Sequence, residues 1–547
     1  MRYPSIFSLM GIALAALSGC GGEASRSAEL EEIAIDTLTI DRHLQALASD
    51  EFLGRKPFTA GETKTLAYLE EELKKLGLEG ANQGSFLQEV PLVEIAPQAD
   101  SVMLVKAPGS SFELRLRDDF VLYTQREQAE ISIADAEVVF CGYGIVAPEY
   151  GWNDYEGVDM TGKIALVLVN DPGYESEDST FFKGNIMTYY GRWTYKFEEA
   201  ARQGAAGVLV VHQPGPAGYP WFVSQGSSLA PRLNLVTPNQ GMDRCAVQGW
   251  VTLNAAVELL RASPVKGIKF FEAAGAPGFK PIPLGVEVSV GLKSTFKKNV
   301  SYNVAAMLPG TQRPEEVIVY SAHWDHLGVG APVEGDSIYN GAVDNASGTA
   351  ALLAIAEAFS KLEQKPERTV VFLFVTAEEQ GLLGSRYYCA NPLFPIDKTV
   401  ANINMDGLNP NGRMRDLTVI GYGQSELDDY AAAEAARQGR YIMPDQEPEK
   451  GYYFRSDHFN FARVGVPALY ASGSYDHWDH GLEYGKAKAD EYTTQRYHRP
   501  ADEYAPGLWE LAGVGQDAQL YFNIGLRLAN ERSFPQWREG SEFKRQE

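Results

Sequence analysis

The C-terminal half of the chain alternates short, almost continuous apolar runs with segments of helical periodicity. The runs are too short for buried helices and are bounded by polar turns, so they predict strands; they cover residues 317–322, 369–376, 400–405, 417–421 and 467–471. Helices are predicted over Ser347–Leu362, with Asn345 or Ser347 as the capping residue, and over Glu426–Gln438. Apolar strands alternating with helices are typical of an α/β fold with a mixed, mostly parallel sheet sandwiched by helices.

Residues 98–280 differ from the C-terminal half in their pattern of apolar and turn-forming residues. Short apolar strands at 136–140, 163–169 and 207–211 alternate with Gly, Pro and Asp turns, and one helix is predicted at 196–203. His212 is the only histidine of this stretch, which therefore offers no cluster of metal ligands. We expect an inserted β-rich domain over 98–280, which divides the main domain into residues 34–97, with helices at 41–48 and 60–76, and residues 281–547.

The first 33 residues are not expected to join either domain. Arg2 precedes a mostly apolar stretch from Ile6 to Leu17, which is too short to remain as a membrane span and is typical of an export signal. Leu17-Ser18-Gly19-Cys20 resembles the cleavage box of bacterial lipoproteins. That resemblance implies a signal peptide over 1–19, lipidation of Cys20, a tether over 20–33 and anchoring in the cell envelope, with Gly21 compatible with the outer membrane. A plain secretory signal is the alternative.

The net charge limits the classes of binding partner, and the cysteine content bears on whether disulfides form. The formal net charge is 48 − 72 = −24, which argues against nucleic acid or an anionic membrane surface. Cys141, Cys245 and Cys389 remain after Cys20, and three cysteines at these spacings do not form a disulfide framework. Buried free thiols are expected, although a single pair is possible.

Acids and histidines follow the predicted strands where each strand ends. His323-Trp324-Asp325-His326 follows the first, Glu378 and Glu379 the second, and Asp406 the third, while a loop with Asp344 precedes a helix. Strand ends of such a sheet meet at one edge, where ligand sites gather. Crowded carboxylates would repel each other unless a cation compensated them, and mixed His and carboxylate ligands suit zinc. A carboxylate shared by two ions would give the two-metal arrangement used in hydrolysis.

Five motifs in this order resemble the co-catalytic zinc exopeptidases, which include bacterial leucine aminopeptidase, aminopeptidase S and glutamate carboxypeptidase. The motifs are His323-x-Asp325-His326-x-Gly328, Asn340-Gly341-x-x-Asp344-Asn345-x-Ser347-Gly348, Glu378-Glu379-x-Gly381-x-x-Gly384-Ser385, Asn404-Met405-Asp406 and Tyr497-His498-x-x-x-Asp502. The resemblance covers roughly residues 34–99 and 281–535. Residues 98–280 resemble the protease-associated domain inserted in many of these enzymes, with an implied role in substrate access.

The resemblance implies a role for each residue. Two Zn²⁺ ions would be bound, one by His323 and Asp406, the other by Glu379 and His498, with Asp344 bridging them. Glu378 would be the general base, and Asp325 and Asp502 would orient His323 and His498 through hydrogen bonds. Tyr453, three residues before Ser456-Asp457-His458, would help to hold the oxyanion, with Arg455 as a competing donor. The substrates would be peptides, cleaved at the N-terminus.

Several alternatives stay open. A carboxypeptidase or dipeptidase would share the same motifs, a glutaminyl-cyclase-like acyltransferase would use one zinc, and a receptor such as the transferrin receptor would keep the fold without the chemistry. The complete ligand set argues against the receptor. A second His-Trp-Asp-His, at residues 477–480, has no place in the family's ligand set and is expected to be a polar loop. The sequence does not indicate the side-chain preference or the oligomeric state.

Overall fold

The computed structural model describes residues 33–544 except 175 and 177. The expected signal peptide, Cys20 and almost all of the tether lie outside the described residues, so lipid anchoring stays a prediction. No described helix is both long and apolar enough to cross a membrane. Cys141, Cys245 and Cys389 are buried and free, as expected.

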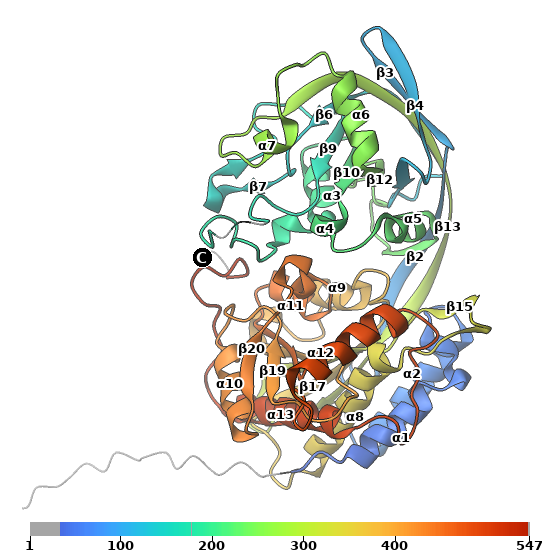
Figure 1. Ribbon diagram of the computed structural model, residues 1–547. Coiled ribbons are helices and arrows are strands. Elements are labelled where there is room, and N and C mark those ends of the chain that lie inside the picture. The colour runs from blue at the N-terminus through green and yellow to red at the C-terminus, as the bar shows by residue number, and fades with distance from the viewer. Residues whose placement is uncertain (1–32, 175, 177, 545–547) are drawn as a thin grey trace, which may run out of the picture. The chain divides into compact units, whose positions relative to one another are not determined.

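Residues 33–86 and 309–544 form the inner lobe, which is built on one mixed sheet (Figure 1). Its central strands are parallel and confirm the predicted runs: β17 (Arg368–Val375), β14 (Arg313–His323), β18 (Thr399–Asn404) and β21 (Ala468–Ser472) lie side by side in that order. On one side, β13 (Ile282–Leu308) pairs antiparallel with β17 and carries β1 (Glu79–Gly80) on its outer edge. On the other side, β19 (Asp416–Val419) pairs antiparallel with β21, and β20 (Tyr441–Pro444) closes the edge. The predicted fold class is thereby confirmed.

Helices cover both faces of this sheet because alternate strand residues are apolar on each side. Ile318 and Tyr320 face a core shared with α1 (Thr37–Leu47), α8 (Gly348–Lys361) and α13 (Ala512–Asn530). Val317 and Val319 face a second core that includes side chains of α9 (Leu383–Ala390) and α11 (His458–Arg463). The remaining inner-lobe helices are α2 (Ala60–Lys75), α10 (Leu427–Arg437) and α12 (Gly481–Glu491).

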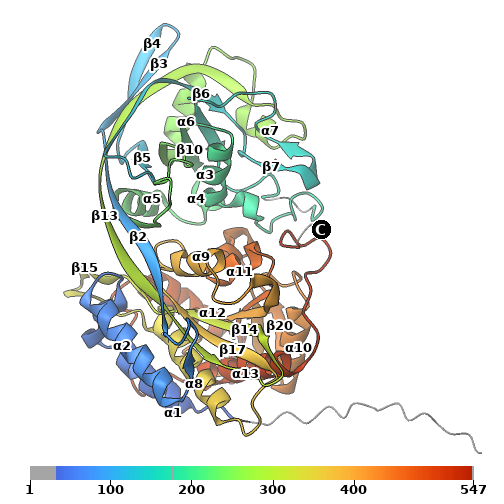
Figure 2. The same ribbon diagram turned by 180° about the vertical axis from the view of Figure 1, so that it is seen from behind.

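Two long strands connect the inner lobe to the rest of the chain. β2 (Leu87–Ala99) pairs with β13 without interruption from Leu87–Val304 to Ala99–Leu292. Figure 2 shows this ribbon curving along one side of the molecule from one lobe to the other. The expected domain limits at 98 and 280 therefore fall at or near this ribbon and not in flexible linkers.

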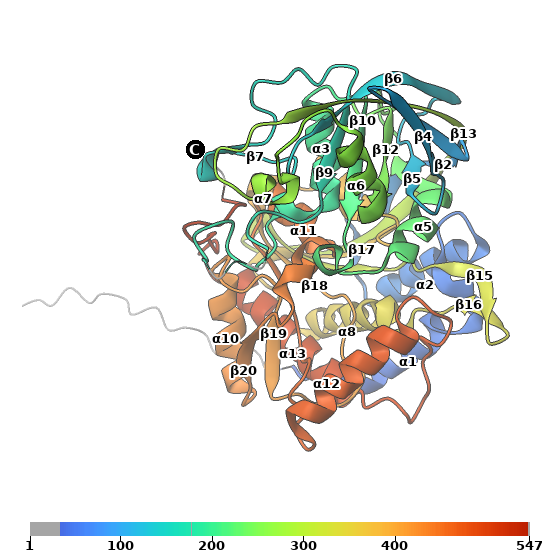
Figure 3. The same ribbon diagram turned by 45° about the horizontal axis from the view of Figure 1, so that its top comes forward.

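Residues 100–281, here called the outer lobe, contain more helix than the expected β-rich domain (Figure 3). Four strands are parallel: β6 (Glu130–Phe140), β9 (Ile164–Leu168), β10 (Gly207–His212) and β12 (Val247–Thr252). The edges are antiparallel: β5 (Phe120–Tyr123) pairs with β12, and β13 joins β6 to the hairpin of β3 (Val102–Ala107) and β4 (Ser110–Arg115). The helices α3 (Trp193–Arg202) and α6 (Leu253–Ala262) pack on opposite faces, each against its own apolar cluster. A division into domains at these residues stays a prediction.

Candidate metal centre

The predicted strand ends deliver their acidic and histidine side chains to one place. His323 is the last residue of β14, Glu378 and Glu379 follow β17, and Asp406 follows β18. Asp344 comes from the irregular turn η4 (Ala342–Ser347) directly before α8. We call His323, Asp344, Glu378, Glu379, Asp406 and His498 the acid cluster.

Asp344 stands between two groups of possible ligands. The Nε2 atom of His323 lies 3.2 Å from one oxygen of Asp344 and 3.2 Å from Asp406 Oδ1. The Nε2 atom of His498 lies 3.2 Å from the other oxygen of Asp344 and 3.1 Å from Glu379 Oε2. The structure thus brings all five predicted ligands together, with Asp344 shared by the two groups.

His326 also belongs to the second group, although the sequence favours a structural histidine over a ligand at this position. Its Nδ1 atom lies 2.6 Å from Glu379 Oε1, and His326, Asp344 and Glu379 can offer ligand atoms to one ion. The signal was present in the sequence, because His326 follows the same strand end as His323. Outside a regular strand, the sequence does not determine in which direction the side chain three residues after His323 points. The contact of His326 with Glu379 therefore could not be predicted from the sequence.

The charges of the acid cluster are interdependent. Burial alone would lower the pKa of His323, but the carboxylates of Asp406, Glu378 and Asp344 outweigh it and raise that pKa well above its ordinary value. Burial likewise opposes ionisation of Asp344, yet its contacts with His323 and His498 hold its pKa well below the ordinary value. The imidazolium groups therefore provide the positive charge that the carboxylates need. A divalent cation bound to neutral imidazoles would supply the same charge, so the donor set fits zinc.

Glu378 differs from its neighbours because no cationic contact offsets its burial sufficiently. Burial, Asp406 and Glu379 together raise the pKa of Glu378 well above the ordinary value, against the opposing effect of His323. By contrast, the attraction of His498 outweighs burial and lowers the pKa of Glu379 to about 2. Adjacent carboxylates with separated pKa values are typical of sites in which one acts as ligand and the other as proton carrier.

Asp325 contacts His323 differently from the expectation. Its carboxylate oxygen lies 3.9 Å from His323 Nδ1, which is too far for a hydrogen bond, while its backbone carbonyl lies 3.1 Å from that nitrogen. The carboxylate instead accepts a hydrogen bond from the backbone N–H of Glu378 at 3.0 Å. Asp325 therefore orients His323 through its main chain and fixes the position of Glu378 through its side chain.

The expected role of Asp502 as an orienter of His498 is not what the structure shows. The Asp502 carboxylate accepts hydrogen bonds from the backbone N–H groups of Val343, at 3.0 Å, and Asp344, at 3.1 Å. His498 has a positive φ of 56° and follows the helical segment that ends at Arg496, so no helical four-residue spacing connects it to Asp502. Asp502 thus holds the turn that presents Asp344.

Tyr453 does not reach the acid cluster. Its ring packs edge-on to His458 and stacks on Phe543, and its buried hydroxyl has no hydrogen-bond partner among the described residues. Glu542 and Asp428 are the charged groups nearest enough to affect it. The expected contribution to an oxyanion site is therefore not supported by this placement.

Three other residues that the sequence analysis did not select contact the acid cluster. The hydroxyl of Ser456 donates to Asp406 Oδ2 at 2.5 Å, and the hydroxyl of Tyr470 donates to the Asp406 carbonyl at 3.1 Å. The ring of Tyr497 stacks on that of His498 with centroids 3.9 Å apart. These side chains fix the positions of the two outermost ligands. Tyr497 does so from the position next to His498, whereas Ser456 and Tyr470 contact Asp406 from segments that are distant in the sequence.

The second His-Trp-Asp-His closes a loop. His477 Nδ1 accepts hydrogen bonds from the backbone N–H groups of Asp479 and His480, both at 3.1 Å, just before α12 begins. His477 and His480 also stack on each other with centroids 4.7 Å apart. The expectation of a polar loop agrees with this arrangement.

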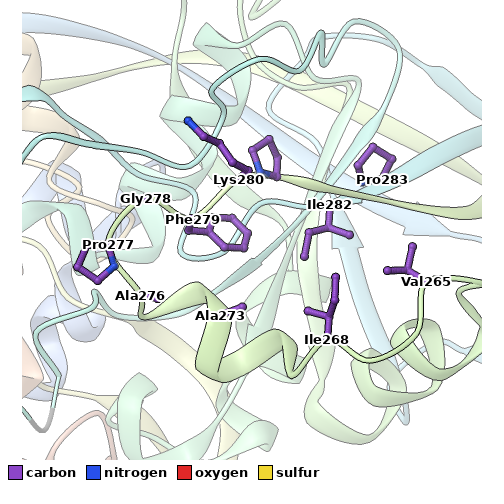
Figure 4. A pocket seen from close by; sticks show the side chains of 11 residues that line it. Val265, Ile268, Ala273, Ala276, Pro277, Gly278, Phe279, Lys280, Ile282 and Pro283 are labelled. Atoms are coloured by element: carbon purple, nitrogen blue, oxygen red, sulfur yellow. The ribbon is translucent and has the colours of Figure 1, made fainter.

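An apolar hollow of about 530 Å³ lies on the outer lobe (Figure 4), and no residue of the acid cluster lines it. It is lined by Val265, Ile268, Phe279 and Ile282 among others, and Lys280 is its only titratable lining residue. Because a single amine offers no set of metal ligands, the acid cluster is the candidate functional site.

Comparison with known proteins agrees with this geometry. Residues 303–522, which contain the whole acid cluster, match the peptidase family M28. Over this segment the chain is similar to that peptidase family. A 138-residue stretch is 35% identical to mouse aminopeptidase NAALADL1, covering 24% of this chain and 17% of the mouse protein. Leupeptin-inactivating enzyme 1 of Streptomyces exfoliatus is 31% identical over 181 residues, covering 32% of this chain and 36% of that enzyme.

A solved structure shares the fold of this chain. The aminopeptidase from Aneurinibacillus sp. strain AM-1 superimposes with a TM-score of 0.50 and 20% identity, covering 92% of this chain and 96% of that one. The chain spans only about a sixth to a third of the length of the curated relatives described above. The fold is therefore shared over nearly the whole chain, while the similar stretches of the two curated relatives cover 24% and 32% of it.

Proposed function

We propose that this protein is a zinc-dependent exopeptidase that hydrolyses N-terminal residues from peptides. The observation that carries the proposal is Asp344, whose two carboxylate oxygens face His323 and His498 separately. The match to peptidase family M28 and the name of the mouse relative, an aminopeptidase, support the reaction class.

Two ions would be held by five side chains. His323 and Asp406 would bind one ion, Glu379 and His498 the other, and Asp344 would contribute one oxygen to each. When bound, the cations would supply Lewis acidity for the scissile carbonyl and for an attacking water. Because His326 contacts Glu379 at 2.6 Å, it would fix the orientation of that ligand or take part in binding itself.

The proton transfers fall to Glu378. Its raised pKa matches a group that takes a proton from the attacking water and returns it to the leaving amine. The hydrogen bond from its backbone N–H to Asp325 keeps the carboxyl next to the ligands. Asp502 has a comparable positioning role, because it holds the backbone of Asp344.

Matched peptides test this function and separate it from a carboxypeptidase. The same peptide is offered with a free and with an acetylated N-terminus, before and after treatment with a chelator and re-addition of zinc. We expect zinc-dependent release of the first residue from the free-amine peptide only. Cleavage of both peptides would identify a carboxypeptidase, and cleavage of neither would contradict the proposal.

A further inference from the structure

The residues after α13, here called the tail segment (531–544), are packed against the inner lobe. The backbone N–H of Glu426 donates to the Gln536 carbonyl, and the Gln536 N–H donates back to the Glu426 carboxylate, both at 2.9 Å. The indole N–H of Trp537 donates to a backbone carbonyl at 3.1 Å, and Phe543 is only 9% exposed. The tail segment is therefore part of the packed structure as far as Phe543.

Glu542 joins the tail segment to the outer lobe. One of its carboxylate oxygens lies 3.3 Å from Lys183 Nζ, and the other accepts a hydrogen bond from the backbone N–H of Tyr189 at 3.1 Å. The ring of Tyr189 lies 5.1 Å from that of Phe459 in α11, and the ring of Phe543 lies 6.1 Å from the same Phe459 ring, measured between centroids. The tail segment, the outer lobe and α11 therefore meet in one apolar cluster.

Direct ring contacts lead from Phe543 to a predicted metal ligand. The ring of Phe543 stacks on that of Tyr453, with centroids 5.4 Å apart and planes 22° apart. Tyr453 packs edge-on to His458 at 4.7 Å, and His458 packs on Tyr470 at 5.0 Å. The hydroxyl of Tyr470 donates to the backbone carbonyl of Asp406 at 3.1 Å. Phe543 is thus connected to Asp406 through three rings.

His458 makes the packing of these rings important. Its imidazole is fully buried, and neither ring nitrogen has a hydrogen-bond partner among the described residues. The position of this imidazole therefore depends on the rings of Tyr453 and Tyr470. A Cβ at Gly421 would overlap a ring carbon of Tyr453, so the Tyr453 ring has no spare space on that side. Close-packed side chains transmit a displacement to their neighbours, so a shift of Tyr453 would reach Tyr470.

Tyr453 also lies in the turn that brings Ser456 to Asp406. The hydroxyl of Ser456 donates to the Asp406 carboxylate at 2.5 Å and accepts a hydrogen bond from the Asn404 amide at 2.8 Å. Ser456 stands between Tyr453 and His458 in the sequence. The carboxylate and the carbonyl of Asp406 are therefore both held by groups that adjoin the contact between Tyr453 and His458.

We propose that Phe543 is a positioning residue of the metal centre, because it supports Tyr453 and thereby keeps Asp406 in place for zinc. Glu542 shares this role, since it anchors the tail segment to the outer lobe. The inference rests on the proposed function, which assigns one ion to His323 and Asp406.

The test measures zinc affinity on the full-length protein by competition with a chelator. Residues that contact a metal ligand typically contribute 10–100-fold to affinity, and Phe543 acts at a greater distance, so Phe543→Ala should weaken one of the two ions by about 3–10-fold. Glu542→Ala leaves no cavity in the apolar cluster and should weaken the same ion. Unchanged affinity in both variants, or an equal loss for both ions, would overturn the inference.

Phe534→Ala is the matched control, because it truncates another phenylalanine of the same segment. Phe534 packs under the guanidinium of Arg368, 4.9 Å from its ring centroid, and against a different apolar cluster. This variant should be less stable than the wild type but bind zinc with wild-type affinity. A loss of zinc affinity equal to that of Phe543→Ala would show general loosening and would contradict a positioning role.

A double-mutant cycle tests the route. Tyr453→Ala removes the ring that links Phe543 to His458, so adding Phe543→Ala should cause little further loss of zinc affinity. Tyr453→Phe keeps the ring and should keep the wild-type affinity. Additive losses in the double variant would show that the two residues act independently and would rule out this route.

Peptide turnover separates this inference from the proposed function. At limiting zinc, turnover of a free-amine peptide by Phe543→Ala should fall in proportion to the lost zinc, and excess zinc should restore it. If the wild type binds two zinc ions but cleaves no peptide, the proposed exopeptidase function fails, and the comparison of zinc affinities still decides the inference. A wild type that binds no zinc would overturn both.

Discussion

Glu378 and Glu379 are neighbours in sequence with opposite electrostatic surroundings. We expect Glu378→Gln to lower kcat by about 10²–10⁴-fold, because general acid–base catalysis contributes on that scale, while zinc remains bound. Glu379→Gln is the matched comparison and should lower the zinc content. Turnover is followed with a free-amine peptide and zinc by elemental analysis. Normal turnover in the Glu378 variant would remove it from the mechanism.

At Tyr453, the role implied by the family resemblance disagrees with the placement of the side chain in the structure. Its hydroxyl is buried and has no partner in the part of the chain that the structure describes, so Tyr453→Phe removes a polar group that gains nothing from burial. We expect kcat within about twofold of the wild type and a melting temperature that does not fall, because an oxyanion donor is usually worth 10²–10³-fold in kcat. A loss of that size would restore the role implied by the resemblance.

Asp502 holds a metal ligand through the main chain. Asp502→Ala would leave the N–H groups of Val343 and Asp344 without their acceptor, at about 1–3 kcal/mol for each buried donor. We expect a lower free energy of unfolding in urea and weaker zinc binding in competition with a chelator. Unchanged zinc affinity would show that the turn keeps Asp344 in place unaided.

At the scale of elements, the loop before α12 depends on one imidazole. His477→Ala removes the acceptor of two backbone N–H groups, an effect comparable to losing a helix cap, and should lower the free energy of unfolding by about 0.5–2 kcal/mol. The neighbouring His480→Ala should have little effect on stability because His480 is exposed. Both variants should bind as much zinc as the wild type, and a loss of zinc in the first would show that the loop is a metal site.

Elements with a strong hydrophobic pattern could be predicted from the sequence. Elements that depend on pairing with residues far away in the sequence could not. The central strands and α8 are visible in sequence because they are buried on both faces, and His323, Glu379 and Asp406 lie at or just after the ends of these strands. β13 was missed because its 27 residues include exposed lysines 297 and 298 and pair with a strand almost 200 residues earlier. The contacts of Asp502 and Tyr453 were missed for the same reason, since motif spacing outside a helix does not give direction.

At the scale of the whole molecule, a buried histidine predicts acid sensitivity. His43 lies between Arg42 and Tyr68, and burial together with the Arg42 charge lowers its pKa to about 4. The unfolded chain takes up this proton near pH 6.5, and the folded chain only near pH 4. Stability from the neutral imidazole is therefore present above pH 6.5 and lost as the pH falls toward 4.

The expected contribution is about 2 kcal/mol between pH 7 and pH 5. It is measured as the difference in urea unfolding between the wild type and His43→Gln, in which all other titrating groups are shared. The variant should lose less stability than the wild type over this interval. Identical losses would show that His43 titrates alike in both states.

The ribbon of β2 and β13 has a consequence for how this chain can be divided. Because the same two strands carry the ladder of hydrogen bonds into both lobes, a shortened protein made by splicing across residues 98–280 would expose unpaired strand edges. Such edges promote self-association, so a soluble half-protein would need a redesigned hairpin at the cut. The two lobes share one continuous strand pair, so removing either lobe leaves unpaired backbone N–H and C=O groups at the sheet edge of the other.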